Sequence, residues 1–207
     1  MGLVKGKTVR ISKKAAPDGP QSCEMLAAEL EDFNVTARRH AAQKIVTCQD
    51  GATALIGRLQ REDNTAVREA ILNSLLRMRD PSIVSGLADC LRSENVALRN
   101  DVIEVFKQLG SQAAPVLRAL LADTDPDVRI FAVNILISER YSDTEQWAIE
   151  VIERDAHVNV CAAAVDLLCE VGTEASIDPL LRLKTRFVHE AYIQFAADLA
   201  LKRIREI

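Results

Sequence analysis

The chain has 207 residues and a formal net charge of −4, with 48% apolar but only 4% aromatic residues. An apolar fraction of this size is normal for a folded chain, and so few aromatics favour a core of Ala, Leu, Ile and Val between closely packed helices. Residues 1–19 carry a net charge of +4, so the rest of the chain carries −8. Such an acidic body argues against a nucleic-acid-binding groove.

The first 20 residues, MGLVKGKTVRISKKAAPDGP, are a basic amino-terminal tail rich in Gly, Lys and Pro, without a helical period. This composition favours a flexible tail. Residues 7–12, KTVRIS, favour extended structure, so the alternative is that they dock as a strand on a partner or a neighbouring subunit. The tail is therefore a candidate for an additional partner contact.

From Ser22 onward the apolar residues recur at helical spacing and predict pairs of helices. The predicted pairs are 22–33 with 34–48, 51–61 with 64–77, 81–92 with 95–109, 112–123 with 125–138, 142–154 with 158–171, and 174–184 with 188–207. Asp80-Pro81, Gly110, Asp143 and Gly172 mark joints between pairs. Residues 21–207 are thus one domain of six repeats, at about 22–49, 50–79, 80–110, 111–140, 141–172 and 173–207.

One recurring phrase opens the second helix of each pair, which we name the inner helix. In the fourth repeat it begins with Asp125 and Pro126, which suit a helix cap and a first helical turn, followed by Val128 and Arg129. If Val128 is position 0, the equivalent residues in the other repeats are Ala37, Val67, Leu98, Val160 and Tyr192. The intervals of 30, 31, 30, 32 and 32 residues are nearly constant, which identifies a repeat protein.

The aligned inner helices show one apolar and one polar face. Positions 0, +4, +5 and +8 are apolar and predict the core, whereas positions +2 and +6 lie opposite, and +6 is polar in every repeat. The polar face is either only solvated or an extended binding surface, and the apolar Ile130 in its middle favours binding. The residues predicted to bind a partner are Glu69, Asn73, Asn100, Glu104, Ile130, Asn134, Asp166 and Asp198.

Position +1 lies beside the apolar face but holds an arginine in the first four repeats: Arg38, Arg68, Arg99 and Arg129. A guanidinium at the edge of a core needs acceptors, because an unpaired buried charge is very costly. Position −3 offers candidate acceptors in Asn34, Asn64, Asn95 and Asp125. The sequence therefore predicts a structural ladder, which ends where Cys161 and Ile193 replace the arginine and leave a more apolar seam.

The recurring Asp/Asn-x-x-Val-Arg phrase resembles the HEAT-repeat family, in the short bacterial form also found in phycobilin-lyase subunits; the resemblance covers about residues 22–207. It implies an all-α, right-handed α-solenoid of about six helix pairs, with the inner helices on the concave face. It further implies a scaffold that binds another protein in a bacterial complex. The alternative that it offers is a phycobilin lyase or isomerase subunit, and a DNA-lesion-binding enzyme ranks last.

The sequence contains no phosphate-binding loop and only three histidines, so we expect no enzyme, cofactor or metal. His157 and His189 stand 32 residues apart, which a metal pair or, more simply, equivalent polar turns explain. The five cysteines are Cys23, Cys48, Cys90, Cys161 and Cys169; without paired spacing, they are expected to be free thiols. No apolar run is long enough for a membrane span. We therefore expect a cytoplasmic chain with no membrane insertion.

Overall fold

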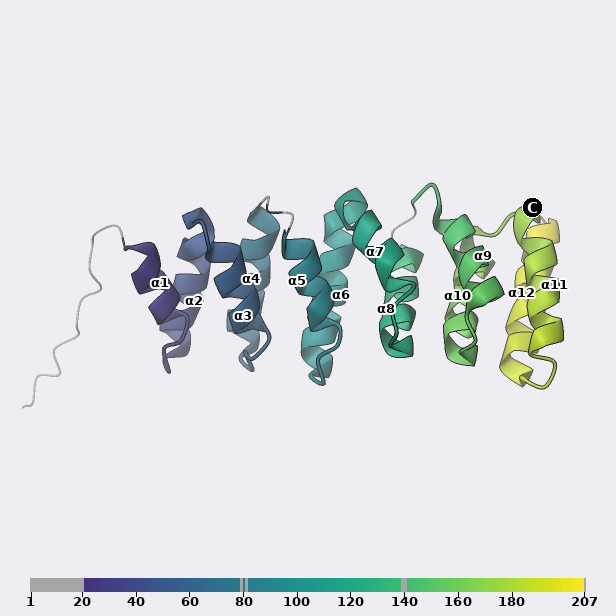
Figure 1. Cartoon of the computed structure of the whole chain (residues 1–207), viewed down its shortest axis with the longest axis horizontal. Coiled ribbons are helices and arrows are strands. Elements are labelled where there is room, and N and C mark those ends of the chain that lie inside the picture. Colours follow the sequence, from purple (N-terminus) through teal and green to yellow (C-terminus); the bar gives the residue numbers. More distant parts are fainter. Residues whose placement is uncertain (1–20, 79, 81, 139–140, 207) are drawn as a thin grey trace, which may run out of the picture.

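The computed structural model describes residues 21–206 except residues 79, 81, 139 and 140. The basic tail of residues 1–20, with its predicted partner contact, lies outside the described residues. Within the described part the chain forms helices and no strand. The prediction of an all-α solenoid is confirmed, with hairpins that follow one another along the long axis in chain order (Figure 1).

The described residues form six helix pairs. Their helices are α1 (Cys23–Glu29) and α2 (Val35–Lys44), α3 (Gly51–Leu59) and α4 (Thr65–Arg77), α5 (Ser82–Cys90) and α6 (Val96–Leu109), α7 (Ala114–Leu120) and α8 (Pro126–Ser138), α9 (Thr144–Arg154) and α10 (Val158–Val171), and α11 (Ile177–Arg186) and α12 (Ala191–Glu206). Short 3₁₀ turns lie at Ile45–Thr47, Gly110–Ala113 and Glu174–Ser176. The even-numbered helices, which are the inner helices of the repeats, pack on one another in succession from α2 to α12.

The residues at position −3 begin the inner helices. The Asn34 side chain accepts from the Thr36 amide at 2.8 Å, and the Asn64 side chain accepts from the Ala66 amide at 3.1 Å. Asn95 and Asp125 accept in the same way from amides of α6 and α8. These side-chain oxygens therefore cap amides that the helix itself leaves without a partner.

The core follows the apolar columns of the inner helices, but the last repeat is shifted by one residue. Helices α2 to α10 each begin two residues before position 0, whereas α12 begins at Ala191 and so places Ile193 at position 0. Ile193 is fully buried, while Tyr192 is 55% exposed. The prediction that Tyr192 occupies the core column is therefore wrong, because one residue turns a helix position by about 100°.

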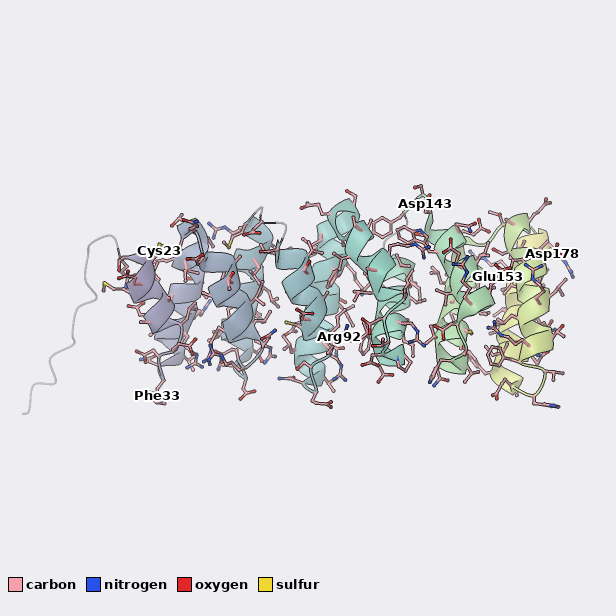
Figure 2. The ribbon with its side chains drawn as sticks, viewed as in Figure 1. Cys23, Phe33, Arg92, Asp143, Glu153 and Asp178 are labelled. Carbon is pink, nitrogen blue, oxygen red and sulfur yellow. A yellow bond between two sulfur atoms is a disulfide. The ribbon has the colours of Figure 1, made fainter. Side chains whose placement is uncertain are left out.

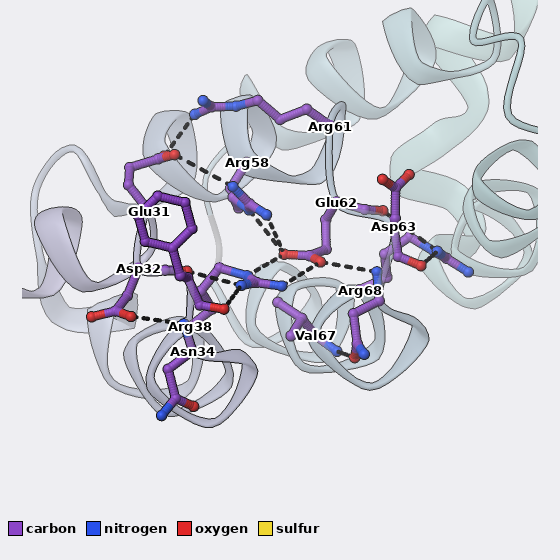
Figure 3. A network of polar contacts seen from close by, with 12 residues as sticks. Glu31, Asp32, Asn34, Arg38, Arg58, Arg61, Glu62, Asp63, Val67 and Arg68 are labelled. Atoms are coloured by element: carbon purple, nitrogen blue, oxygen red, sulfur yellow. Dashed lines mark hydrogen bonds and ion pairs between the residues drawn. The ribbon is translucent and has the colours of Figure 1, made fainter.

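The arginines close the turns between paired helices. Arg38 donates to the Asp32 carbonyl at 2.8 Å and, through Nε, to Glu62 of the next repeat at 2.7 Å (Figure 3). Arg129 repeats the pattern, with the Asp123 carbonyl at 2.8 Å and Asp155 at 2.6 Å. Both carboxylates stand at position −5 of the following repeat. The side-chain acceptors are thus these acids and not the predicted Asn and Asp residues at position −3.

The other two arginines keep the turn contact but find different partners. Arg68 donates to the Asp63 carbonyl and pairs with Asp101 at 2.8 Å, because position −5 of the next repeat is a serine. Arg99 donates to the Ser93 carbonyl and lies 5.6 Å from the ring centre of Phe131, while Asp123, the acid at position −5 of the next repeat, pairs with Arg92. An arginine whose position −5 carboxylate is absent or already paired thus uses the nearest acid or an aromatic face.

The contacts continue beyond the fourth repeat, where an apolar seam was expected. The Cys161 thiol contacts the Asp155 carbonyl at 3.3 Å. Arg186, from α11, donates to the Asp155 carbonyl at 2.9 Å and to the carbonyls of Ile152 and Glu153 at 2.8 Å. An arginine of the following repeat therefore replaces the one missing at position 161.

The first pair is closed by a disulfide between Cys23 and Cys48, whose Cα atoms are 5.7 Å apart. Figure 2 places Cys23 at the start of the first hairpin. The prediction of five free thiols is wrong for these two, because the hairpin brings together residues that are 25 positions apart. The disulfide also removes one argument for a cytoplasmic location. Among the described helices, none has the length and apolarity needed to cross a membrane.

Candidate binding surface on the inner helices

The side chains at positions +2 and +6 of the inner helices, most of them exposed, form a continuous face, which we name the inner-helix strip. With the corrected register, its members are Arg39, Gln43, Glu69, Asn73, Asn100, Glu104, Ile130, Asn134, Ala162, Asp166, Phe195 and Leu199. Six of the predicted binding residues are exposed on it: Glu69, Asn73, Asn100, Glu104, Asn134 and Asp166. Its first five repeats are mostly polar.

Two predicted binding residues have other roles. Ile130 is partly buried and packs against the hydrophobic core, so it is not the exposed centre of the strip. Asp198 forms an ion pair with Lys184 of α11. In the corrected register Asp198 stands at position +5, beside the strip, because position 0 of the last repeat lies one residue later than predicted.

The strip ends in an apolar cluster that the sequence reasoning missed. Tyr192, Phe195 and Leu199 of α12 are 55%, 67% and 49% exposed, and Val188 in the preceding turn is 60% exposed. Their spacing of three or four residues places them on one side of the helix. We name these four residues the α12 patch. Once the helix is known to start at Ala191, Phe195 and Leu199 fall at positions +2 and +6, which are the positions of the strip.

The α12 patch has carboxylates beside it. The Tyr192 hydroxyl donates to both carboxylate oxygens of Asp166 on α10, at 3.0 Å each. This hydrogen bond, together with burial and the charge of Asp166, raises the pKa of Tyr192. Glu190 lies between Val188 and Tyr192 in the chain and is exposed. Within the described part of the chain, neither Asp166 nor Glu190 belongs to an ion pair.

The hollows on the strip are small and polar. A cleft of about 400 Å³ with Arg118 and Arg129 in its wall lies elsewhere, at the turns between the fourth and fifth repeats. On the strip, a cleft of about 300 Å³ lies between α2 and α4 and is lined by Arg39, Glu69 and Asn73 among others. The described residues contain no cluster of three potential metal ligands, His157 and His189 included. The surface is therefore suited to contact with another macromolecule more than to enclosure of a small ligand.

No protein-family model and no curated protein matches this sequence. Two engineered proteins of known structure are similar to it: one has a TM-score of 0.41 at 16% identity, over 89% of this chain and 96% of its own. The other has a TM-score of 0.39 at 16% identity, over 91% and 100%. The complex of CpcE and CpcF of phycocyanin lyase from Nostoc sp. has a TM-score of 0.37 at 17% identity, over 95% and 98%. At these identities and TM-scores the likeness goes no further than the helical-repeat fold that the described residues themselves show.

The lyase among these structures corrects one expectation. We predicted a chain that is not an enzyme, and that prediction is contradicted because a protein of similar architecture is a phycocyanin lyase. A helical-repeat fold does not decide between binding and catalysis, since function resides in the site that the fold carries. The fold therefore does not license the conclusion that the chain lacks catalytic activity.

Proposed function

We propose that the protein binds another protein through the inner-helix strip, with the α12 patch as its anchor. The observation that carries this proposal is the exposure of Tyr192, Phe195 and Leu199 on one side of one helix. Large apolar side chains that gather on a surface, beside polar neighbours, resemble the centre and rim of a protein interface. The polar remainder of the strip supplies the rim.

The position of the patch favours a protein as ligand over a small molecule. Its members lie on an exposed helix face, and the clefts that adjoin the strip at α2, α4 and α6 are lined mainly by polar side chains. A small apolar ligand needs an enclosed pocket to bury most of its surface. A partner surface can instead cover the whole patch and exclude water from Phe195, the most exposed of the three α12 side chains.

Replacing Phe195 with aspartate is expected to weaken partner binding at least tenfold while the fold stays intact. The substitution adds a charge at an exposed position, so the melting temperature should stay close to that of the wild type. Binding should fall because, in the complex, an uncompensated charge would occupy the place where Phe195 is buried against the partner. The measurement is the recovery of co-purifying proteins from the native cells, compared by quantitative mass spectrometry.

The matched control is Leu181→Asp, which changes an exposed leucine of α11 in the same helix pair. It should retain the partners that Phe195→Asp loses. Equal recovery of the same proteins by the two variants would contradict the proposal, as would an unfolded Phe195→Asp variant, which would place Phe195 in the core.

A second candidate function is that of a phycobilin lyase-type subunit, which follows from the sequence resemblance. In that case the phycobiliprotein itself is the partner of the strip. Incubation of the protein with a bilin and an apo-phycobiliprotein should then yield a phycobiliprotein with covalently attached bilin, detected by absorbance after denaturing electrophoresis. The same Phe195→Asp variant should lose this activity. Absence of chromophore transfer with every bilin tested would leave the binding function alone.

A further inference from the structure

We propose that the partner of the α12 patch is the basic amino-terminal segment, residues 7–13, of a second copy of this chain. This inference rests on the proposed function and names its occupant. It follows from three features: the chemistry of the patch, the residue pattern of the segment, and the distance between the two ends of the solenoid.

The patch presents apolar side chains next to negative charge. Phe195 and Leu199 are its exposed apolar members on α12, and Asp166 and Glu190 stand beside it without a cationic partner in the described residues. Covering the apolar side chains with a neutral partner would also draw these carboxylates towards a drier environment, at a cost in free energy. An occupant with lysines or arginines beside its apolar residues removes that cost.

The amino-terminal segment carries that pattern. Its sequence is KTVRISK, with Lys7, Val9, Ile11 and Lys13 at alternate positions. Alternate residues of an extended segment point to the same side, so two β-branched apolar residues are flanked by two lysines on one side. From Lys7 to Lys13 an extended chain spans about 20 Å. The segment therefore offers apolar contacts for the patch and a cation at each end for its carboxylates.

The chain's own segment does not reach its own patch. The first and last helix pairs lie at opposite ends of the solenoid (Figure 1). Packed helices are about 9 Å apart, so the five steps from α2 to α12 cover roughly 45 Å. The ten residues from Ile11 to Gln21 extend over at most about 35 Å. The contact is therefore formed between two copies.

Such a contact joins different surfaces of the two copies. It is heterologous, because the amino-terminal segment of one copy meets the α12 patch of the next, and it leaves one of each unoccupied in a dimer. Successive copies then form a ring or an open chain, depending on the rotation between them. Since lysines pair with exposed carboxylates, association should weaken as salt is added.

Sedimentation velocity of the full-length chain at several concentrations tests this inference. The wild type is expected to associate with increasing concentration. Phe195→Asp, which alters the patch, and Lys7→Glu/Lys13→Glu, which alters the segment, should each shift association to at least tenfold higher concentration. Circular dichroism verifies that both variants remain folded, and Arg77→Ala, which alters an exposed side chain of α4, serves as the control.

The decisive measurement mixes the two variants. The Phe195→Asp variant keeps a normal segment and the Lys7→Glu/Lys13→Glu variant keeps a normal patch, so a mixture should form a heterodimer that neither forms alone. If the Lys7→Glu/Lys13→Glu variant associates as strongly as the wild type, the inference is overturned in favour of patch-to-patch pairing. If the wild type stays monomeric throughout, the inference is also overturned. The proposed function is then tested separately, by whether Phe195→Asp recovers fewer of the other proteins that co-purify with the wild type.

Discussion

Glu62→Gln is expected to lower the free energy of unfolding at pH 7 by about 3 kcal/mol, a cost typical of breaking a buried ion pair. Glu62 is buried and accepts from Arg38 at 2.7 and 3.0 Å, from Arg58 at 2.9 Å and from the Asn64 amide at 2.9 Å. Glutamine keeps the shape but removes the charge, so the buried guanidinium of Arg38 loses its counterion. Urea unfolding followed by circular dichroism measures the change.

The same carboxylate predicts how stability depends on pH. Burial alone raises the pKa of Glu62, but the hydrogen bonds from Arg38, the Asn64 amide and Arg58 outweigh it and lower the pKa from 4.5 to about 2. Because the pKa of Glu62 is lower in the folded state than in the unfolded state, the stability that its carboxylate contributes is present above the unfolded-state pKa. This stability is lost as pH falls from about 5 to 2. The difference between the folded-state and unfolded-state pKa of Glu62 corresponds to about 3 kcal/mol of stability, at 1.36 kcal/mol per pKa unit.

The matched control for this prediction is Glu69→Gln, which alters an exposed glutamate of the inner-helix strip. It should change the free energy of unfolding by less than about 0.5 kcal/mol at pH 7. Between pH 5 and 2 the wild type and Glu69→Gln should lose stability more steeply than Glu62→Gln. Parallel pH profiles for all three proteins would contradict the assigned role of Glu62.

Reduction of the disulfide between Cys23 and Cys48 is expected to destabilise the first helix pair by about 3 kcal/mol, as a closed loop of this length implies. The bond links the start of α1 to the turn after α2 and so restricts the unfolded chain over a separation of 25 residues. Hydrogen exchange with and without reductant measures the effect. Amides of α2 should lose protection, while those of α10 should change little.

The double variant Cys23→Ser/Cys48→Ser is the control for the reduction experiment. Without reductant, its α2 amides should already be as weakly protected from hydrogen exchange as those of the reduced wild type. Adding reductant should not change their protection. A wild-type protein whose exchange is unchanged by reductant would contradict the prediction. A similar loss across all six helix pairs would mean that the array unfolds as one unit instead of repeat by repeat.

The binding surface was only partly predictable. The polar columns of α4, α6 and α8 were placed correctly on the outside, because their positions follow from the helical period once the first residue of each helix is known. In the last repeat position 0 was misplaced by one residue. Because of that error, Tyr192 was assigned to the core column in place of Ile193, and the exposed Phe195 and Leu199 were not assigned to the strip. A comparison of the starts of all inner helices would have revealed the error.

What the sequence alone determined is local: the helix pairs, their spacing, and the cap at Asp125. Helical period and capping depend on residues within a few positions of one another, so they can be derived from a single sequence. The tertiary structure decided the rest: that Arg38 pairs with Glu62, that Cys23 joins Cys48, and that Arg186 supplies the turn contacts that the arginine column lacks at position 161. These partners lie 24 to 34 positions apart in the chain and meet only because adjacent helices and repeats pack together.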